Sequence, residues 1–228
     1  PFMGFRAIRF CLQHPEIFKD QLRAILRASA HGKVRILYPM ISGLQELKDA
    51  NTFLEQAKNE LREREIAFDE SIEVGSMVEI PSAVYLADTL AQHCHFFSIG
   101  TNDLIQYMLA ADRMNDRIAH LYTASHPSVL RAIQAVIESG IRHNIPVSIC
   151  GEMASDPRYV ALLLGMGAHE LSLTLPSFAE INYLIRRLGA RAVSELAENA
   201  LAMSDPGEIS RLISSFHQGL IADIEAEV

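Results

Sequence analysis

The chain has 228 residues, of which 49% are hydrophobic and 21% are charged, and its formal net charge is −8 at pH 7. This composition is typical of a soluble globular protein with one large domain or two small ones. The acidic balance disfavours broad binding to nucleic acid or to an anionic membrane, and no apolar stretch reaches the roughly 18 residues that would span a bilayer.

The three cysteines are odd in number and widely spaced, which favours a reducing, cytoplasmic compartment over a disulfide framework. Residues 1–9 lack the layout of a signal peptide and begin without an initiator Met. We therefore expect a cytoplasmic fragment of a longer protein.

Hydrophobic spacing predicts helices and strands that alternate along the chain. Pro15 near the start and Gly32 after the end delimit a first helix over residues 14–30. Ser42 and Gln45 resemble a capping box that opens a second, longer helix. Short apolar runs predict five strands, at residues 34–40, 72–80, 96–99, 147–150 and 170–173. Further helices are expected at 81–93, 102–111, 127–143, after a cap at Asp156, from a cap at Ser177 to 189, and at 190–203 and 206–224.

Five β-then-α units in succession indicate parallel strands joined by right-handed crossovers. A closed (β/α)₈ barrel needs eight such units and typically about 250 residues. Periodicity alone therefore leaves two α/β architectures open. One is an open, doubly wound sheet, and the other is the C-terminal part of a barrel, with about five units and additional C-terminal helices.

Polar residues on four of the predicted strands are hard to explain as core. They are Arg35, Glu79, the pair Asn102 and Asp103, and Cys150, and the segment before the first helix adds Arg6 and Arg9. Because the carboxyl ends of parallel strands meet on one face of the sheet, we expect these groups to converge there.

Several of these side chains suit the chemistry of a phosphorylated acid. Glu79 and Asp103 are a plausible Mg²⁺ pair, since this ion commonly takes one or two carboxylates and completes its shell with water and substrate oxygens. The alternative is that Glu79 pairs structurally with an arginine. Asn102 can donate to an oxyanion, and Arg113 can clamp a phosphate or carboxylate bidentately.

Cys150 admits two interpretations. A lone cysteine on an apolar strand is usually an inert core residue. The turn that follows, Gly151 and Glu152, exposes the end of the strand. Beside acidic groups and an anionic substrate, the pKa of the thiol should rise, so the thiol would stay protonated and serve as a proton donor.

These segments resemble the PEP-utilising domain of the phosphoenolpyruvate–protein phosphotransferase family, known as enzyme I of the bacterial phosphotransferase system. The resemblance runs from residue 2 to about residue 220. Its specific parts are the residues 2–9, 75–81, 97–104, Asp112-Arg113 with Asn115, Leu121-Tyr122, His126-Pro127 and 150–154.

The resemblance implies a (β/α)₈ barrel, with residues 1–228 forming a PEP-binding domain that is truncated at its N-terminal side. It implies that Glu79 and Asp103 hold Mg²⁺, and that Arg6, Arg113 and the amide of Asn102 grip phosphoenolpyruvate. Cys150 would protonate the methylene carbon as pyruvate forms.

The resemblance also implies partners. The phosphoryl group would pass to a histidine on a separate N-terminal domain and from there to a phospho-histidine carrier protein, in sugar uptake or in nitrogen-linked signalling. The family dimerises through this domain, so a homodimer is expected. The fragment alone is expected to be inactive, because the phospho-histidine domain and the first barrel strands lie outside it.

Three other interpretations remain open at this point. One is the corresponding domain of pyruvate phosphate dikinase or phosphoenolpyruvate synthase, which share the Gly100-to-Asp103 motif type. Another is a Mg²⁺-dependent C–C lyase on a similar barrel, which would need neither Cys150 nor a phosphate clamp. The third is a non-catalytic dimerisation or sensor module.

Overall fold

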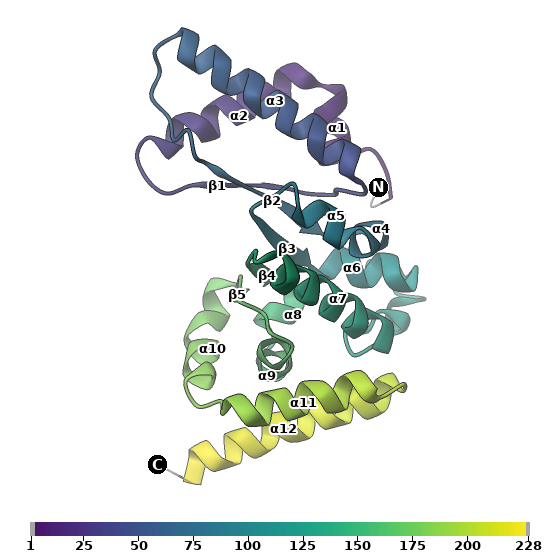
Figure 1. Ribbon diagram of the computed structural model, residues 1–228. Helices are drawn as coiled ribbons and strands as arrows, with labels where there is room; N and C mark the ends of the chain where they lie inside the picture. The colour runs from purple at the N-terminus through teal and green to yellow at the C-terminus, as the bar shows by residue number, and fades with distance from the viewer. Residues whose placement is uncertain (1–2, 227–228) are drawn as a thin grey trace.

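The computed structural model describes residues 3–226, and its centre is a sheet of five parallel strands (Figure 1). The strands lie side by side in sequence order, β1-β2-β3-β4-β5. Their bounds are β1 Arg35–Tyr38, β2 Glu73–Val78, β3 Phe96–Gly100, β4 Val147–Cys150 and β5 Glu170–Leu171. All five predicted strands are confirmed, although the last is only two residues long.

Helices precede, connect and follow the strands. They are α1 Ile8–Gln13, α2 Pro15–Ser29, α3 Leu44–Glu63, α4 Pro81–Tyr85, α5 Ala87–Ala91, α6 Thr101–Leu109, α7 Pro127–His143, α8 Glu152–Ser155, α9 Pro157–Gly165, α10 Phe178–Ile185, α11 Ala190–Ala202 and α12 Pro206–Ala226. Short 3₁₀ turns cover Ala119–Leu121 and Leu175–Ser177. In Figure 1, α2 and α3 cover β1 at one end, and α11 and α12 pack beyond α9 at the other.

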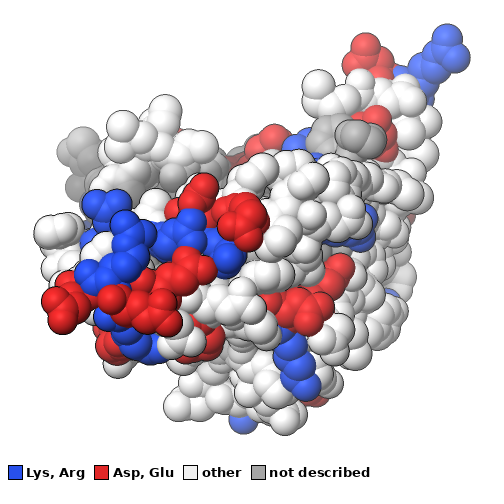
Figure 2. Space-filling model, turned by 90° about the horizontal axis from the view of Figure 1, so that it is seen from above, with Lys and Arg blue, Asp and Glu red and all other residues white. Residues whose placement is uncertain are grey.

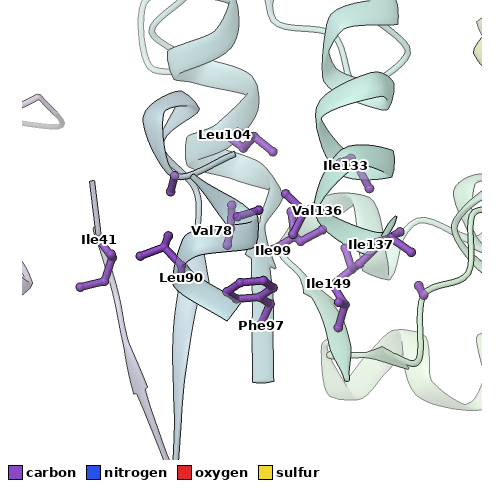
Figure 3. Close-up of a cluster of buried hydrophobic side chains, with 14 of the residues drawn as sticks. Ile41, Val78, Leu90, Phe97, Ile99, Leu104, Ile133, Val136, Ile137 and Ile149 are labelled. Carbon is purple, nitrogen blue, oxygen red and sulfur yellow. The ribbon is translucent and has the colours of Figure 1, made fainter. Parts of the chain in front are cut away.

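Strand periodicity separates the two faces of the sheet. Phe97 and Ile99 of β3 and Ile149 of β4 point toward α7, where they pack with Ile133 and Ile137 (Figure 3). All five of these side chains are fully buried. The alternate positions on the same strands face the other way, and they carry the polar residues of the candidate site.

The sheet curls like the wall of a barrel. A flat sheet of five strands would hold its two outer strands nearly 20 Å apart, at about 4.8 Å per strand. Yet Arg35 at the start of β1 reaches Glu170 at the start of β5, with 3.4 Å between Nη2 and Oε2. The Arg35 guanidinium also lies 4.8 Å from the centre of the Phe96 ring on β3. This curvature and the sequential strand order identify part of a (β/α)₈-type barrel, because a doubly wound sheet would reverse its strand order.

The position of Arg35 corrects one expectation. Arg35 lies at the amino end of β1, paired in register with Glu73, so it is at the opposite end of the sheet from the strand carboxyl ends. Arg35 therefore does not join the predicted site. Gly75 makes room for the Phe96 ring beneath Arg35, since a Cβ at Gly75 would sit 2.4 Å from that ring.

Two of the predicted helix starts differ in detail. Helix α3 begins one residue later than a Ser42 cap requires, with Gly43 as its N-cap. The Ser42 backbone N–H and hydroxyl both donate to Glu46, at 2.6 and 2.8 Å, so Gln45 is not the capping partner. Ser177 makes no capping hydrogen bond, whereas Asp156 accepts from the Arg158 backbone N–H as predicted.

Two predicted helix lengths also change. The helix expected over 81–93 divides at Leu86 into α4 and α5, and α10 ends at Ile185 rather than at residue 189.

The charged residues on the outer surface form local pairs. Figure 2 looks down on α2 and the later part of α3, where basic and acidic side chains are intermixed. Glu60 pairs with Lys19 at 3.1 Å and also with Arg23, and Arg62 pairs with Glu70 at 2.5 Å. The Arg62–Glu70 pair is exposed, and pairs of this kind contribute little to stability. Among residues 3–226, no helix is both long enough and apolar enough to cross a membrane.

Candidate active site

Glu79 lies directly after β2, and three neighbouring strand ends hold its carboxylate. The side chain is only 5% exposed, and its Oε1 accepts a hydrogen bond of 2.6 Å from the backbone N–H of Met40, which follows β1. Gly100 at the end of β3 leaves space for Oε2, because a Cβ there would lie 2.8 Å from that atom. Met40 adopts φ 59°, a strained conformation for a residue with a side chain. The carboxylate is therefore fixed by main-chain geometry.

Asp103 lies in the first turn of α6, the helix that follows β3, and it is also buried. One of its oxygens, Oδ2, forms an ion pair with Arg6. The Arg6 guanidinium also contacts the Met40 sulfur, at 3.7 Å. The other oxygen, Oδ1, is buried and has no hydrogen-bond partner among residues 3–226. Buried polar atoms normally have a partner, so this oxygen has capacity for a ligand.

The Glu79 carboxyl group responds to its burial and to the charges around it. Burial is the main reason why the pKa of Glu79 is raised, and the Met40 N–H opposes it. The negative charge of Asp103 raises this pKa further, while the positive charge of Arg6 lowers it. A cation placed between the two carboxylates would relieve both the desolvation and the repulsion.

Cys150 ends β4, opposite Gly100 in the register, and it is half-buried. The thiol is 3.4 Å from the carbonyl oxygen of Ile99, to which it donates, and it accepts from the Ser98 hydroxyl at 3.5 Å. Burial raises the pKa of the Cys150 thiol, the Ser98 hydrogen bond lowers it, and the negative charge of Glu79 raises it. The thiol is therefore protonated at neutral pH, as the sequence suggested.

A cleft of about 700 Å³ opens beside this thiol. Its lining includes Asn102, Cys150, Ser172 and Thr174. The cleft is large enough for a small phosphorylated acid, and Cys150 forms part of its wall. The described residues that line the cleft do not include Glu79, Asp103 or the two predicted arginines, Arg6 and Arg113.

Asn102 ties the start of α6 to the turn after β4. Its Oδ1 accepts from the backbone N–H of Glu152 at 2.9 Å, and its amide nitrogen lies 3.5 Å from the Glu152 carboxylate. The Thr101 hydroxyl donates to the Cys150 carbonyl at 2.8 Å. Both contacts pass over Gly151, which has φ 100°. The cysteine and the amide are therefore positioned by one turn.

Replacing Gly151 with alanine is expected to destabilise the protein by about 2 kcal/mol, because the positive φ disfavours a side chain. A Cβ there would also meet the Thr101 hydroxyl at 2.5 Å and Asn102 Oδ1 at 2.8 Å. Thermal unfolding would measure the loss. Gly32→Ala is the matched control, because nothing lies within 4 Å of its Cβ position. Equal melting temperatures for the two variants would contradict this account of the turn.

Arg113 follows α6 and reaches the same region through Tyr122. Its backbone N–H donates to Gln106 at 3.2 Å. The Tyr122 hydroxyl donates to the Asn102 carbonyl at 3.2 Å. Burial raises the pKa of Tyr122, as does the charge of Glu152, whereas a hydrogen bond with the Arg113 side chain lowers it. Arg113 is thus linked to Asn102 through one tyrosine.

The structure brings six predicted residues to the carboxyl ends of the strands, namely Arg6, Glu79, Asn102, Asp103, Arg113 and Cys150. Arg9 lies at the edge of this region, in a separate pocket with Met40 and Tyr107. Residues 3–226 contain no group of three or more His, Cys, Asp or Glu side chains that could hold a metal ion. A metal here would rely on two carboxylates, with solvent or substrate supplying the other ligands.

Sequence reasoning missed Met40 and Ser98. Met40 contributes a backbone N–H at a strained φ, and no side-chain pattern reveals that. Ser98 could have been found, because strand alternation places it on the same face as Gly100 and beside Ser148 in the register.

The curled parallel sheet with polar groups at its strand ends defines the class of barrel-type α/β proteins. A solved structure with a similar fold supports this assignment. The crystal structure of a citrate lyase from Burkholderia xenovorans superposes with a TM-score of 0.56 over 92% of this chain and 68% of that one. Its sequence identity is 18%, so the likeness concerns the fold alone.

The chain belongs to the family of PEP-utilising enzymes, since the family's PEP-binding domain matches residues 1–190. Among curated relatives, the phosphoenolpyruvate-protein phosphotransferase of Mycoplasma capricolum is 44% identical over 220 residues, which is 96% of this chain. The protein of the same name from Bacillus subtilis is 45% identical over 92% of the chain. The chain spans 38% and 37% of the lengths of these two relatives.

Proposed function

We propose that this chain is the PEP-binding domain of a phosphoenolpyruvate–protein phosphotransferase. In this role it binds phosphoenolpyruvate and protonates the enolate that remains when the phosphoryl group leaves. One observation carries the proposal. The buried acids Glu79 and Asp103 lie with Arg6 at the strand ends, and the charge of Glu79 also acts on the protonated thiol of Cys150.

The residues present fit Mg²⁺. Both candidate ligands offer hard carboxylate oxygens, one of which, Asp103 Oδ1, is buried without a hydrogen-bond partner among the described residues. Glu79 and Asp103 would hold the ion. When bound, Mg²⁺ would neutralise negative charge on the phosphate and on the enolate oxygen.

Side chains of this protein would bind and orient the substrate and supply the proton. Arg6 and Arg113 would bind the anionic groups of the substrate, and the amide of Asn102 would orient it. Transfer of the phosphoryl group to a histidine breaks the bond between phosphorus and the enol oxygen and leaves the enolate. The S–H bond of Cys150 then breaks, a C–H bond forms at the methylene carbon, and the electron pair stays on sulfur.

The partners follow from the same proposal. The histidine acceptor would lie on a domain outside this chain, and that domain would pass the phosphoryl group to a phospho-histidine carrier protein. A homodimer in the cytoplasm is part of the proposal, and its support is the family membership. The relatives' shared name favours the phosphotransferase over the dikinase or synthase.

The proposal predicts binding of phosphoenolpyruvate that requires Mg²⁺. Calorimetry on the natural protein should give heat with both present and none after chelation of the metal. In D₂O, the methyl protons of pyruvate should exchange in the presence of protein and Mg²⁺, because enolisation reverses the protonation step. Absence of both the heat and the exchange would refute the proposal.

A further inference from the structure

The thiol of Cys150 has two partners on the neighbouring strand. Ser98 lies on β3 and is 4% exposed, and its hydroxyl is 3.5 Å from the Cys150 sulfur. The sulfur is in turn 3.4 Å from the carbonyl oxygen of Ile99. The three groups form a chain in which the serine donates to the sulfur and the thiol donates to the carbonyl.

In this hydrogen-bond arrangement the Cys150 sulfur donates to one partner and accepts from another. The carbonyl of Ile99 can only accept, so its contact fixes the direction of the S–H bond. The Ser98 hydroxyl supplies the donor and occupies a lone pair of the sulfur. Once the thiol has lost its proton, the carbonyl contact no longer has a hydrogen to bind, whereas the serine contact remains and becomes a hydrogen bond to an ionised acceptor.

The environment of the Cys150 sulfur makes the hydrogen bond from the Ser98 hydroxyl important. The sulfur is half-buried, and the charged side chain whose field acts on it is Glu79, which disfavours a second negative charge. A hydrogen bond to a charged group is worth more than one between neutral groups, and more again in a poorly solvated site.

We propose that Ser98 is a positioning residue for Cys150. Its hydroxyl holds the thiol in one orientation and stays bonded to the sulfur after the proton has moved to the substrate carbon. The inference rests on the proposed function, since it assigns Ser98 to the protonation step of that reaction.

A pair of nearly isosteric variants tests this role. Ser98→Thr keeps the hydroxyl and Ser98→Val replaces it with a methyl group, so any strain from the added branch is common to both. Ser148→Ala is the control. Ser148 lies beside Ser98 in the register on the same face, but its hydroxyl donates to the Phe97 carbonyl at 3.2 Å.

We expect Ser98→Val to reduce kcat for pyruvate methyl exchange about ten-fold relative to Ser98→Thr, with KM changed less than about two-fold. Alkylation of Cys150 by iodoacetamide should also shift to higher pH in the valine variant. Ser148→Ala should match the wild-type protein in both measurements.

Equal kcat values and equal alkylation profiles for the threonine and valine variants would overturn the role of Ser98. A different experiment tests the proposed function on which this inference rests. If Cys150→Ala retains wild-type exchange, Cys150 is not the proton donor, whatever the Ser98 variants do.

Discussion

Replacing Cys150 with alanine is expected to slow exchange of the pyruvate methyl protons by about 100-fold or more, the usual contribution of a general acid. Binding of phosphoenolpyruvate should change little, because the thiol contacts Ser98 and Ile99 rather than the acids and arginines proposed to hold the substrate. Nuclear magnetic resonance in D₂O measures the exchange, and calorimetry measures the binding.

Two further cysteine variants sharpen the test. Cys150→Ser keeps a hydrogen-bonding group at the site, but a hydroxyl is a far weaker acid than a thiol, so this variant should be nearly as slow as alanine. Cys94→Ala is the matched control. Cys94 is a buried thiol that donates to the Leu90 carbonyl, and burial raises its pKa to about 11. Full exchange in Cys150→Ser would show that packing, and not proton donation, is the role of this position.

Replacing Asp103 with asparagine is expected to weaken Mg²⁺-dependent binding of phosphoenolpyruvate by about 100-fold, equivalent to about 2.7 kcal/mol. The substitution removes one carboxylate from the proposed ion site and leaves Arg6 without its partner in the Asp103 ion pair. The Arg6 side chain is 33% exposed, so loss of this pair costs less than the several kcal/mol typical of a fully buried pair. Calorimetry at several Mg²⁺ concentrations would measure the change in affinity for both ligands.

Asp88→Asn is the matched control for this variant, because it removes the same charge from an exposed ion pair. Asp88 lies on α5 and pairs with Arg142 at 2.8 Å, with both side chains more than half exposed. An exposed pair contributes little, so the control should bind like the wild-type protein. If Asp103→Asn responded to Mg²⁺ as the control does, Asp103 would not be a metal ligand.

Most of the fold could be predicted from sequence because hydrophobic periodicity is local. The five strands and the regular alternation with helices were both recognisable, and so were the residues that follow each strand. The errors concern helix ends, the break at Leu86 within the helix expected over 81–93, and the placement of Arg35. Helix α3 starts at Leu44 because Glu46, not Gln45, reaches back to Ser42, and one-residue shifts of this kind depend on backbone geometry.

Periodicity alone could not choose between a barrel wall and an open sheet. The family resemblance implied the barrel, and the tertiary structure confirms it. The two architectures have the same periodicity, and they differ in strand order and in curvature. The contact between Arg35 and Glu170 decides between them, and these residues are 135 positions apart in the chain. Arg35 is the second residue of the strand predicted at 34–40, so its place at the amino end, away from the site, follows from the sequence, and the pairing with Glu73 confirms it.

The sequence by itself determined which chemical groups the protein has at its strand ends. Glu79, Asp103, Asn102 and Cys150 each come directly at or after an apolar run, and parallel strands must end on one side. Only the tertiary structure decided how these groups act on one another. The strained backbone of Met40 and the bare Cα of Gly100 hold Glu79 in place, and the strand register sets Ser98 against the Cys150 sulfur. Such effects depend on distances of a few ångströms between segments far apart in the chain, and local pattern does not encode them.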